Sequence, residues 1–208
     1  MDQYLKVTPF IDSDAEPVKE KARELTGGVK GEKEKARRIF YFVRDEIKYN
    51  AFSPRSLPEQ LRASHVLSRR EGYCVQKAVL LVALARAAGI PARLRFAEIR
   101  SHLIPEKFLK MRGTDVFAYH GYADLYLGGR WVKATPAFDI KACRKAGLIP
   151  VEFDGENDAM LSPYTRDGRP QVEYLLDRGP YEDVPFREIE ETAILVKRLG
   201  RKDEAGTV

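Results

Sequence analysis

The segment from Cys74 to Ala88 constrains the fold more than any other part of the sequence. It is apolar on nearly every side, and charged side chains occur at only two of its positions. A helix that is hydrophobic all round has to be buried. Gly89 follows the segment and Pro91 lies just beyond, which is a typical signal for a helix end. The sequence therefore predicts a central, buried helix that begins at Cys74.

The segments before this helix also have helical patterns. Residues 14–28 carry a capping aspartate, a proline suited to a first helical turn and a Gly-Gly end, and residues 31–50 space their apolar side chains at helical intervals. Pro54 and Pro58 mark a loop, and a short helix is expected over residues 57–70. We therefore expect the first third of the chain to be helical.

After residue 91 the hydrophobic period changes from helical to alternating, which indicates strands. Two alternating segments, residues 92–100 and 117–127, flank residues 101–115, which we expect to form an inserted loop or lid. Gly128-Gly129 is suited to a two-residue hairpin turn into a further strand. The pattern predicts an α+β fold in which the buried helix packs on an antiparallel β-sheet.

The region after residue 150 is rich in glycine, proline and aspartate, so we expect a loop-dominated segment with one short strand. Residues 186–199 have the pattern of a terminal helix, and residues 200–208 that of a flexible tail. A chain of 208 residues, 44% of them hydrophobic, can bury one full core. We therefore predict a single domain over residues 1–199.

Composition argues against several classes of protein. Two cysteines are too few for a disulfide framework and are expected to be reduced thiols. The first residues include an acid and no apolar run, which predicts no signal peptide, and no apolar stretch approaches the ~20 residues of a membrane span. The net charge of +5 comes from alternating basic and acidic residues, a pattern typical of solvated helix faces. We expect a cytoplasmic protein that binds neither nucleic acid nor membranes.

Cys74 stands at the first position of the predicted buried helix. Free backbone N–H groups and the helix dipole stabilise a thiolate at that position. Position alone leaves two interpretations, a catalytic thiol and an inert one, because cysteines at helix starts are often unreactive. Cys143 is expected to be a structural thiol. The sequence has no close ligand pair such as Cys-x-x-Cys, so we predict no metal site and no other cofactor.

A cysteine nucleophile needs a base, and the chain has three histidines. His120 is the best placed, because it lies inside a predicted strand. His65 precedes a short helix and His102 lies in the insertion, so both are expected to serve solvation or local hydrogen bonding. The alternative for His120 is a histidine on a partly polar sheet face that has no catalytic partner.

The acid that would orient His120 has to come from a neighbouring strand. Asp124 shares its face but lies roughly 13 Å away along the same strand, which is too far. Counting back from the predicted hairpin turn places His120 opposite Ala137. Thr135 and Asp139 then lie two residues to either side of that point, and a side chain can span such a diagonal.

Two motifs resemble the transglutaminase-like superfamily of papain-related thiol enzymes. EGYCVQKAVLLVALARAAGIPAR, residues 71–93, is similar to the family's nucleophile segment, with a glycine two residues before the cysteine and a Gly-Ile-Pro-Ala-Arg end. HGYADLYLGGRWVKATPAFD, residues 120–139, is similar to its histidine strand, whose usual form is His-Ala-Trp-x-Glu-Val followed by a hairpin and a tryptophan. The resemblance covers about residues 60–140 and implies a catalytic triad of Cys, His and Asp, with Cys74 as nucleophile and His120 as base.

The chain departs from the family pattern at the third member of that triad. The family's aspartate falls on Thr135, and a threonine does not stabilise an imidazolium as an anion does. Asp139 is the nearest acid on the strand and is within reach by the hairpin count. We therefore predict that Asp139 completes the triad, with Thr135 at that position as the alternative.

The resemblance implies acyl transfer through a thioester on Cys74, with an amide of a protein or peptide as acyl donor. The acceptor is water in a protease or amidase and an amine in a transamidase, and the sequence does not select between them. The oxyanion would bind the backbone N–H of Cys74 and an upstream side chain, for which Tyr49, Asn50 and Gln60 are candidates. The change at Thr135 motivates a second hypothesis, a catalytically weakened domain that binds a peptide or protein. A small-molecule acyltransferase, as in the related arylamine acetyltransferases, is a third.

Overall fold

The computed structural model describes the backbone of residues 1–205, and the side chains of that range except Phe108, Met111 and residues 197–205. The α-helices are α1 (Glu16–Thr26), α2 (Glu32–Tyr41), α3 (Ala63–Arg69), α4 (Cys74–Ala87), α5 (Glu106–Arg112), α6 (Ile140–Ala146) and α7 (Phe186–Ala205). The strands are β1 (Lys48–Tyr49), β2 (Glu71–Gly72), β3 (Ala92–Ser101), β4 (Val116–Leu127), β5 (Arg130–Ala134) and β6 (Val172–Tyr181). Short 3-10 turns span Asp2–Leu5 and Pro58–Leu61, and a π-helical turn spans Phe42–Glu46.

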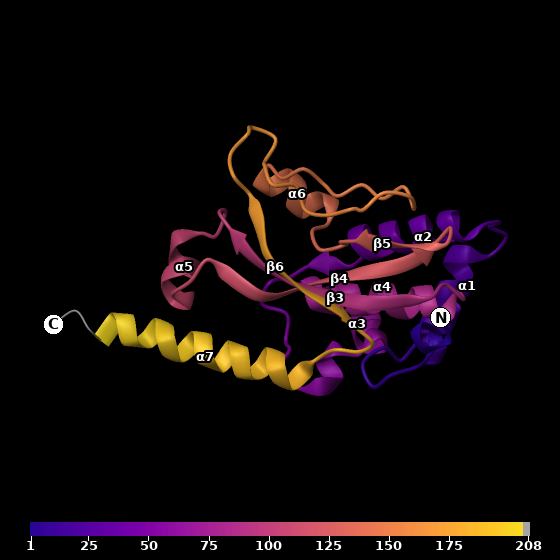
Figure 1. Ribbon diagram of the computed structural model, residues 1–208, viewed down its shortest axis with the longest axis horizontal. Coiled ribbons are helices and arrows are strands. Elements are labelled where there is room, and N and C mark those ends of the chain that lie inside the picture. Colours follow the sequence, from indigo (N-terminus) through magenta and orange to yellow (C-terminus); the bar gives the residue numbers. More distant parts are fainter. Residues whose placement is uncertain (206–208) are drawn as a thin grey trace.

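The predicted central helix is confirmed as α4. Every residue from Val75 to Arg86 is buried, which agrees with its nearly continuous apolar sequence. Helices α1, α2 and α3 pack against α4, and strands β3 and β4 also contact it (Figure 1). The helix therefore lies between a helical layer and a sheet, and the α+β fold class is confirmed.

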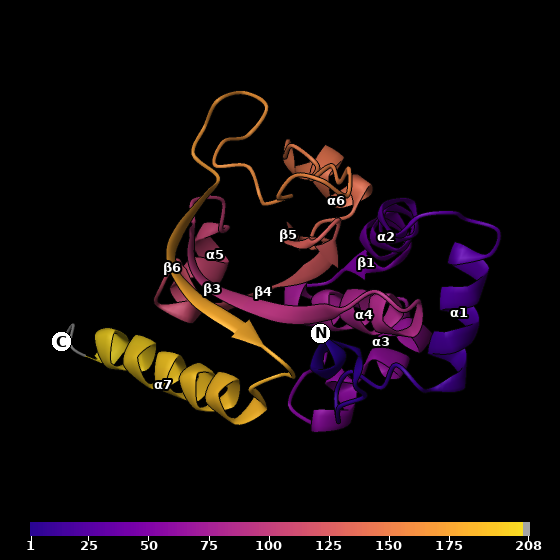
Figure 2. The same cartoon turned by 45° about the vertical axis from the view of Figure 1, so that its right-hand side comes forward.

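The main sheet is antiparallel with the strand order β5-β4-β3-β6. The hairpin between β4 and β5 has the predicted register, with Leu127 opposite Arg130. In Figure 2 the helix α6 and the long segment between α6 and β6 lie at the top, near β5 and α2, and Tyr41 of α2 donates to Glu152 of this segment at 2.8 Å. Strand β6 is longer than the short strand expected from the sequence, since it pairs with β3 along its whole length at the sheet edge.

The insertion and the C-terminal region also differ from the expectations. Residues 101–115 contain the helix α5, which contacts α7. Helix α7 continues to Ala205, past its predicted end at residue 199, and it extends beyond the edge of the sheet in Figures 1 and 2. Residues 206–208 of the predicted tail lie outside the described residues. In the described part of the chain, no helix has the length and apolarity that a membrane span requires.

Two small features near α4 were not predicted. Strands β1 and β2 form a parallel pair of two residues each, which sets Tyr49 opposite Gly72. The π-helical turn lies against the first turn of α4, where the fully buried Lys77 donates to the carbonyls of Arg44 and Ile47 at 2.9 and 2.6 Å. These contacts tie the N-terminal helices to the first turns of α4.

Candidate active site

Cys74 is the first residue of α4, and the turn before it is held by side-chain hydrogen bonds. Tyr73 is the N-cap residue, and its N–H donates to Gln76 Oε1 at 3.1 Å. The amide nitrogen of Gln76 donates to the carbonyls of Pro54 and Gln60 at 2.9 and 2.8 Å. The start of α4 is thereby fixed to the loop that precedes α3, and the thiol lies at the positive end of the helix dipole.

Strand β4 touches the first turn of α4 at Gly121. A Cβ atom on Gly121 would lie 2.9 Å from the Cα of Val75, a distance that real Cβ atoms essentially never show. The backbone of Gly121 lies close enough to the thiol of Cys74 to act against the rise of its pKa. Cys74 is next to Val75 and His120 is next to Gly121 in the sequence, so this backbone contact sets the strand of the predicted base against the helix start of the predicted nucleophile.

The thiol of Cys74 is protonated at rest. Part of the residue is exposed, but the sulfur lies among protein atoms, and this burial raises the pKa of the thiol. Hydrogen bonding by the backbone of Gly121, the positive charge of Arg55 and the first-turn N–H groups of α4 oppose the rise without cancelling it. Reaction therefore requires removal of the proton as the sulfur attacks.

His120 is a neutral, buried imidazole. It is 3% exposed, and burial alone lowers its pKa to about 4. It pairs with Ala97 of β3 beside a β-bulge, a feature that re-aims side chains at functional sites. The rings of Tyr122 and Tyr174 each lie 6.1 Å from the imidazole, measured between centroids. Within the described residues Nε2 has no hydrogen-bond partner, so the imidazole can accept a proton but is not held by an acid.

Asp139 is the N-cap residue of α6. Its carboxylate accepts the N–H of Ala142 and the N–H of Tyr49, both at 2.8 Å. Burial acts to raise the pKa of Asp139, but these hydrogen bonds and the charge of Lys77 bring it below its usual value. The described contacts of Asp139 do not include His120, whose pKa responds to burial and to no charge. Asp139 caps a helix and positions Tyr49, in place of the direct contact with His120 that the sequence predicts.

Thr135 lies closer to the histidine than Asp139 does in the strand register. It follows the end of β5, and extending the hairpin pairing by one residue places it opposite Tyr122. Its side chain is fully buried, donates to Met160 Sδ at 3.5 Å and lies close enough to Tyr174 to act on the pKa of its phenol. The position beside His120 is thus occupied by hydroxyl groups and aromatic rings.

Tyr49 is the one upstream oxyanion candidate that the structure brings to Cys74. Burial and the neighbouring Cys74 both raise the pKa of its phenol, so it remains a hydrogen-bond donor at neutral pH. Asn50 and Gln60 accept hydrogen bonds from backbone N–H groups of their own turns, at 2.9 and 3.1 Å. The β1–β2 pair that places Tyr49 is too short to leave a sequence pattern.

The remaining histidines and the second cysteine have local roles. His102 lies 3.7 Å from Glu173, and His65 is part of α3. Cys143 is 1% exposed, burial raises its thiol pKa to about 11, and its sulfur lies 3.8 Å from the Phe138 carbonyl. Both cysteines are free thiols. In the part of the chain that the structure describes, no cluster of three or more His, Cys, Asp or Glu side chains is arranged to hold a metal ion.

Comparison with known proteins adds a family and a fold. The family model of the transglutaminase-like superfamily matches residues 19–136. No curated protein matches the sequence. A solved structure of a candidate cysteine protease from Cytophaga hutchinsonii superposes with a TM-score of 0.50 and 24% identity, over 64% of this chain and 40% of that chain.

Two further solved structures are similar at lower scores. A candidate protease from Parabacteroides distasonis has a TM-score of 0.43 and 18% identity, over 61% of this chain and 26% of its own. The periplasmic domain of TgpA from Pseudomonas aeruginosa has a TM-score of 0.45 and 18% identity, over 64% and 45%. The chain spans less than half the length of each of these proteins. The first superposition indicates a shared fold, and the family model covers more than half of this chain, Cys74 and His120 included. The chain belongs to the transglutaminase-like superfamily.

Proposed function

We propose that the protein catalyses acyl transfer or amide hydrolysis on a protein or peptide through a thioester on Cys74, with His120 as the base. The observation that carries this proposal is the contact between Gly121 and Val75, since it sets the strand of the histidine against the helix start that bears the thiol. A binding module has no physical need for a thiol and an imidazole at such a contact.

The chemistry starts from a neutral thiol and a neutral imidazole. As the sulfur of Cys74 bonds to the acyl carbon, its proton passes to His120 and the carbonyl oxygen becomes an oxyanion. The backbone N–H of Cys74 and the hydroxyl of Tyr49 are the donors we assign to that oxygen. His120 then protonates the departing amine, which leaves a thioester. Water or a second amine attacks the thioester and gives its proton to His120. The imidazolium returns this proton to the sulfur as the acyl–sulfur bond breaks, which restores the thiol.

Among the residues that the structure describes, no carboxylate contacts His120, and this supports a second candidate function. An imidazole with a pKa of about 4 and no acid beside it is a poor acceptor for the proton of a thiol whose own pKa is raised. A domain of this kind that binds a peptide and turns it over slowly, or not at all, also fits the site. Trapping the acyl-enzyme separates the two candidates.

The experiment is acylation by a p-nitrophenyl ester, followed by peptide mapping in the mass spectrometer. We expect the acyl group on the peptide of Cys74, and no acylation there in Cys74→Ser. The buried thiol of Cys143 is the internal control, since it shares the chain but not the site. If Cys74 acylates no faster than the thiol of a short unstructured peptide, the acyl-transfer proposal fails. Partition of the preformed acyl-enzyme between water and a primary amine then distinguishes hydrolase from transferase.

A further inference from the structure

Two arginines from different elements converge on the Cys74 end of α4. Arg55 follows Pro54, whose carbonyl is bound by Gln76 of α4. The guanidinium carbon of Arg55 lies 4.6 Å from the ring centroid of Tyr73, the residue directly before Cys74. The charge of Arg55 acts on the thiol of Cys74. Arg55 is therefore held close to the thiol through the N-cap residue of α4.

Arg112 reaches the same region from the histidine side. It is the last residue of α5, and its guanidinium carbon lies 4.2 Å from the ring centroid of Phe117 on β4. Its Nη2 also donates to the carbonyl of Val116 at 3.2 Å. Burial and the charge of Arg55 lower the pKa of Arg112, and Tyr49 opposes this. The positive charge of Arg55 thus acts on Arg112, whose guanidinium is held against Phe117 of β4.

The positive charge of Arg55 is not neutralised by an acid among the described residues. By contrast, Arg93 and Arg95 both contact the buried carboxylate of Asp124. Arg55 is exposed, and stacking on Tyr73 is its closest described contact. The carboxylate of Asp139 approaches Tyr49, but it is held by two backbone N–H groups and faces Lys77. The site therefore carries an uncompensated positive charge beside the nucleophile.

We propose that Arg55 and Arg112 bind a carboxylate of the acyl donor, so that the site selects substrates with a negative charge close to the acyl group that is transferred. A guanidinium matches a carboxylate with parallel N–H donors, and a carboxylate between two guanidinium groups relieves their repulsion. The carboxylate belongs either to the C-terminus of a peptide or to an Asp or Glu side chain. This inference rests on the proposed function, because it assigns the substrate class of the same thiol.

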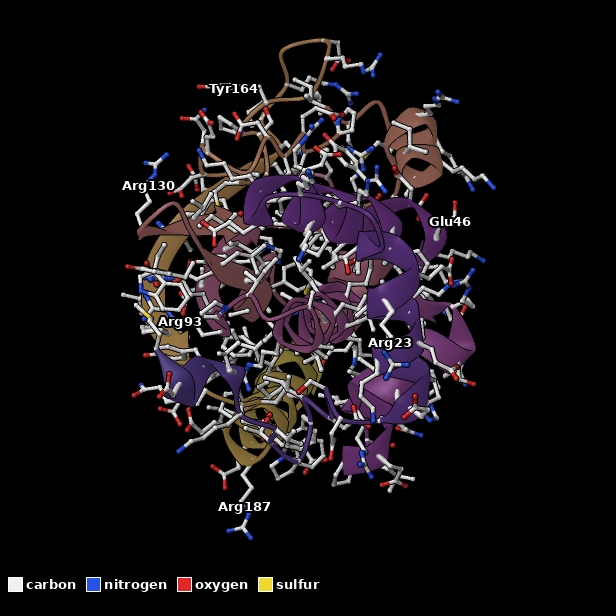
Figure 3. The ribbon with its side chains drawn as sticks, turned by 90° about the vertical axis from the view of Figure 1, so that its right-hand side faces the viewer. Arg23, Glu46, Arg93, Arg130, Tyr164 and Arg187 are labelled. Carbon is white, nitrogen blue, oxygen red and sulfur yellow. The ribbon has the colours of Figure 1, made fainter. Side chains whose placement is uncertain are left out.

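The test compares the alkylation of Cys74 by iodoacetate and by iodoacetamide in a Cys143→Ser background. Both reagents attack the same thiolate, so any change in the thiol pKa cancels in the ratio of their rates. We expect the ratio for the native site to exceed that of a short cysteine peptide, and to fall about three- to tenfold in Arg55→Gln at low ionic strength. Arg187→Gln is the matched control, since Arg187 is exposed and points away from the rest of the molecule (Figure 3). It removes the same charge and should leave the ratio unchanged.

A ratio equal to that of the cysteine peptide, or the same fall in both arginine variants, would overturn the inference. Neither result bears on acylation of Cys74 by the ester, so failure here is distinguishable from failure of the proposed function. Protection of Cys74 against iodoacetamide identifies the source of the carboxylate. N-acetyl-Ala-Ala with a free C-terminus, N-acetyl-Glu-amide and N-acetyl-Ala-Ala-amide serve as the three competitors. Protection by N-acetyl-Ala-Ala alone assigns the carboxylate to a C-terminus, and protection by N-acetyl-Glu-amide alone assigns it to a side chain. Equal protection by all three competitors counts against the inference.

Discussion

Lys77 and His120 are both ionisable, both buried and both close to the first turns of α4, yet their surroundings differ. Lys77 is fully buried, donates to two carbonyls of the π-helical region and faces the acids Asp139 and Asp45. His120 has a buried Nε2 with no described partner, and no charge acts on it. Burial lowers the pKa of both groups, to about 7 for the lysine and to about 4 for the histidine.

The difference teaches how to tell a structural polar group from a functional one. A buried group whose hydrogen bonds are satisfied stabilises one conformation, whereas an unsatisfied group costs on the order of 1–3 kcal/mol. Nε2 of His65 is also buried without a described partner, so an unsatisfied atom by itself does not indicate function. For His120, whose strand touches the helix start that bears Cys74, a role as proton acceptor would explain the cost. We therefore expect substitution of Lys77 to affect folding and substitution of His120 to affect chemistry.

The largest expected effect is on the rate of acylation in His120→Gln. Without the imidazole no group takes the proton of the thiol, so single-turnover acylation of Cys74 should fall about 100- to 10,000-fold at pH 7. His65→Gln is the matched control, because Nε2 of His65 is also buried without a described partner, and its rate should stay the same. Equal losses in the two variants would remove His120 from the mechanism.

The next largest effect is on stability in Lys77→Met. Methionine fills a similar volume but leaves the carbonyls of Arg44 and Ile47 without their donor, so the free energy of unfolding should fall by about 2–4 kcal/mol. Denaturant unfolding followed by circular dichroism measures this. Lys33→Met, which removes an exposed ion pair with Glu156, should cost less than about 1 kcal/mol. A similar cost for both lysines would contradict the structural role of Lys77.

The free energy of unfolding should depend on pH in two separate ranges, one set by His120 and the other by Lys77. The pKa of His120 is about 4 in the fold against 6.5 in the unfolded chain, so the unfolded state binds more protons between these values. Stability is thus fully present above pH 6.5 and falls by up to about 3 kcal/mol as the pH drops towards 4. In His120→Gln this part of the fall should be missing. For Lys77, stability should rise between pH 7 and 10.5, so the two linkages are separable in one pH series of unfolding curves.

The smallest expected effect is in Thr135→Asp, which restores an acid at the strand position beside Tyr122. A carboxylate there should raise the pKa of His120 towards its ordinary value, as measured by NMR titration of the imidazole. The low-pH decline of the acylation rate should move to higher pH by the same amount. Because Thr135 is fully buried, the free energy of unfolding should fall by about 2 kcal/mol. Thr135→Asn has the same shape without the charge, and a pKa shift of equal size in this variant would exclude an electrostatic origin.

The parts of the fold that were predictable depend on local patterns. The helix α4 was predictable because its sequence is a long apolar run that ends in a clear stop signal. The register of the hairpin was predictable from the turn residues Gly128-Gly129. The predicted contact of Asp139 with His120 assumed that the strand continues past Ala134. Asp139 instead caps the start of a helix that ends before Gly147. An aspartate at the N-cap and a glycine at the C-cap are typical helix signals, and the strand count did not take them into account.

The features that sequence patterns missed depend on contacts between distant segments. The two-residue pairing of β1 with β2 places Tyr49, and no periodicity marks so short a strand. The approach of Arg55 and Arg112 also joins residues far apart in the chain, through stacking on rings from two other elements. Single-sequence patterns specify which face is buried, but not which side chains meet at the ends of elements.

The contact of Gly121 with Val75 has a consequence for how this site can change. The usual family residue after the histidine is alanine, and here its methyl group would lie 2.9 Å from a backbone atom. The spacing between the backbones of β4 and α4 at this point is therefore set by two main chains in direct contact, which no change of rotamer can adjust. If the proposed substrate site is correct, substitutions in the loop of Arg55 and the helix of Arg112 can change which substrates bind, whereas the backbone contact at Gly121 leaves the approach of β4 to α4 unchanged.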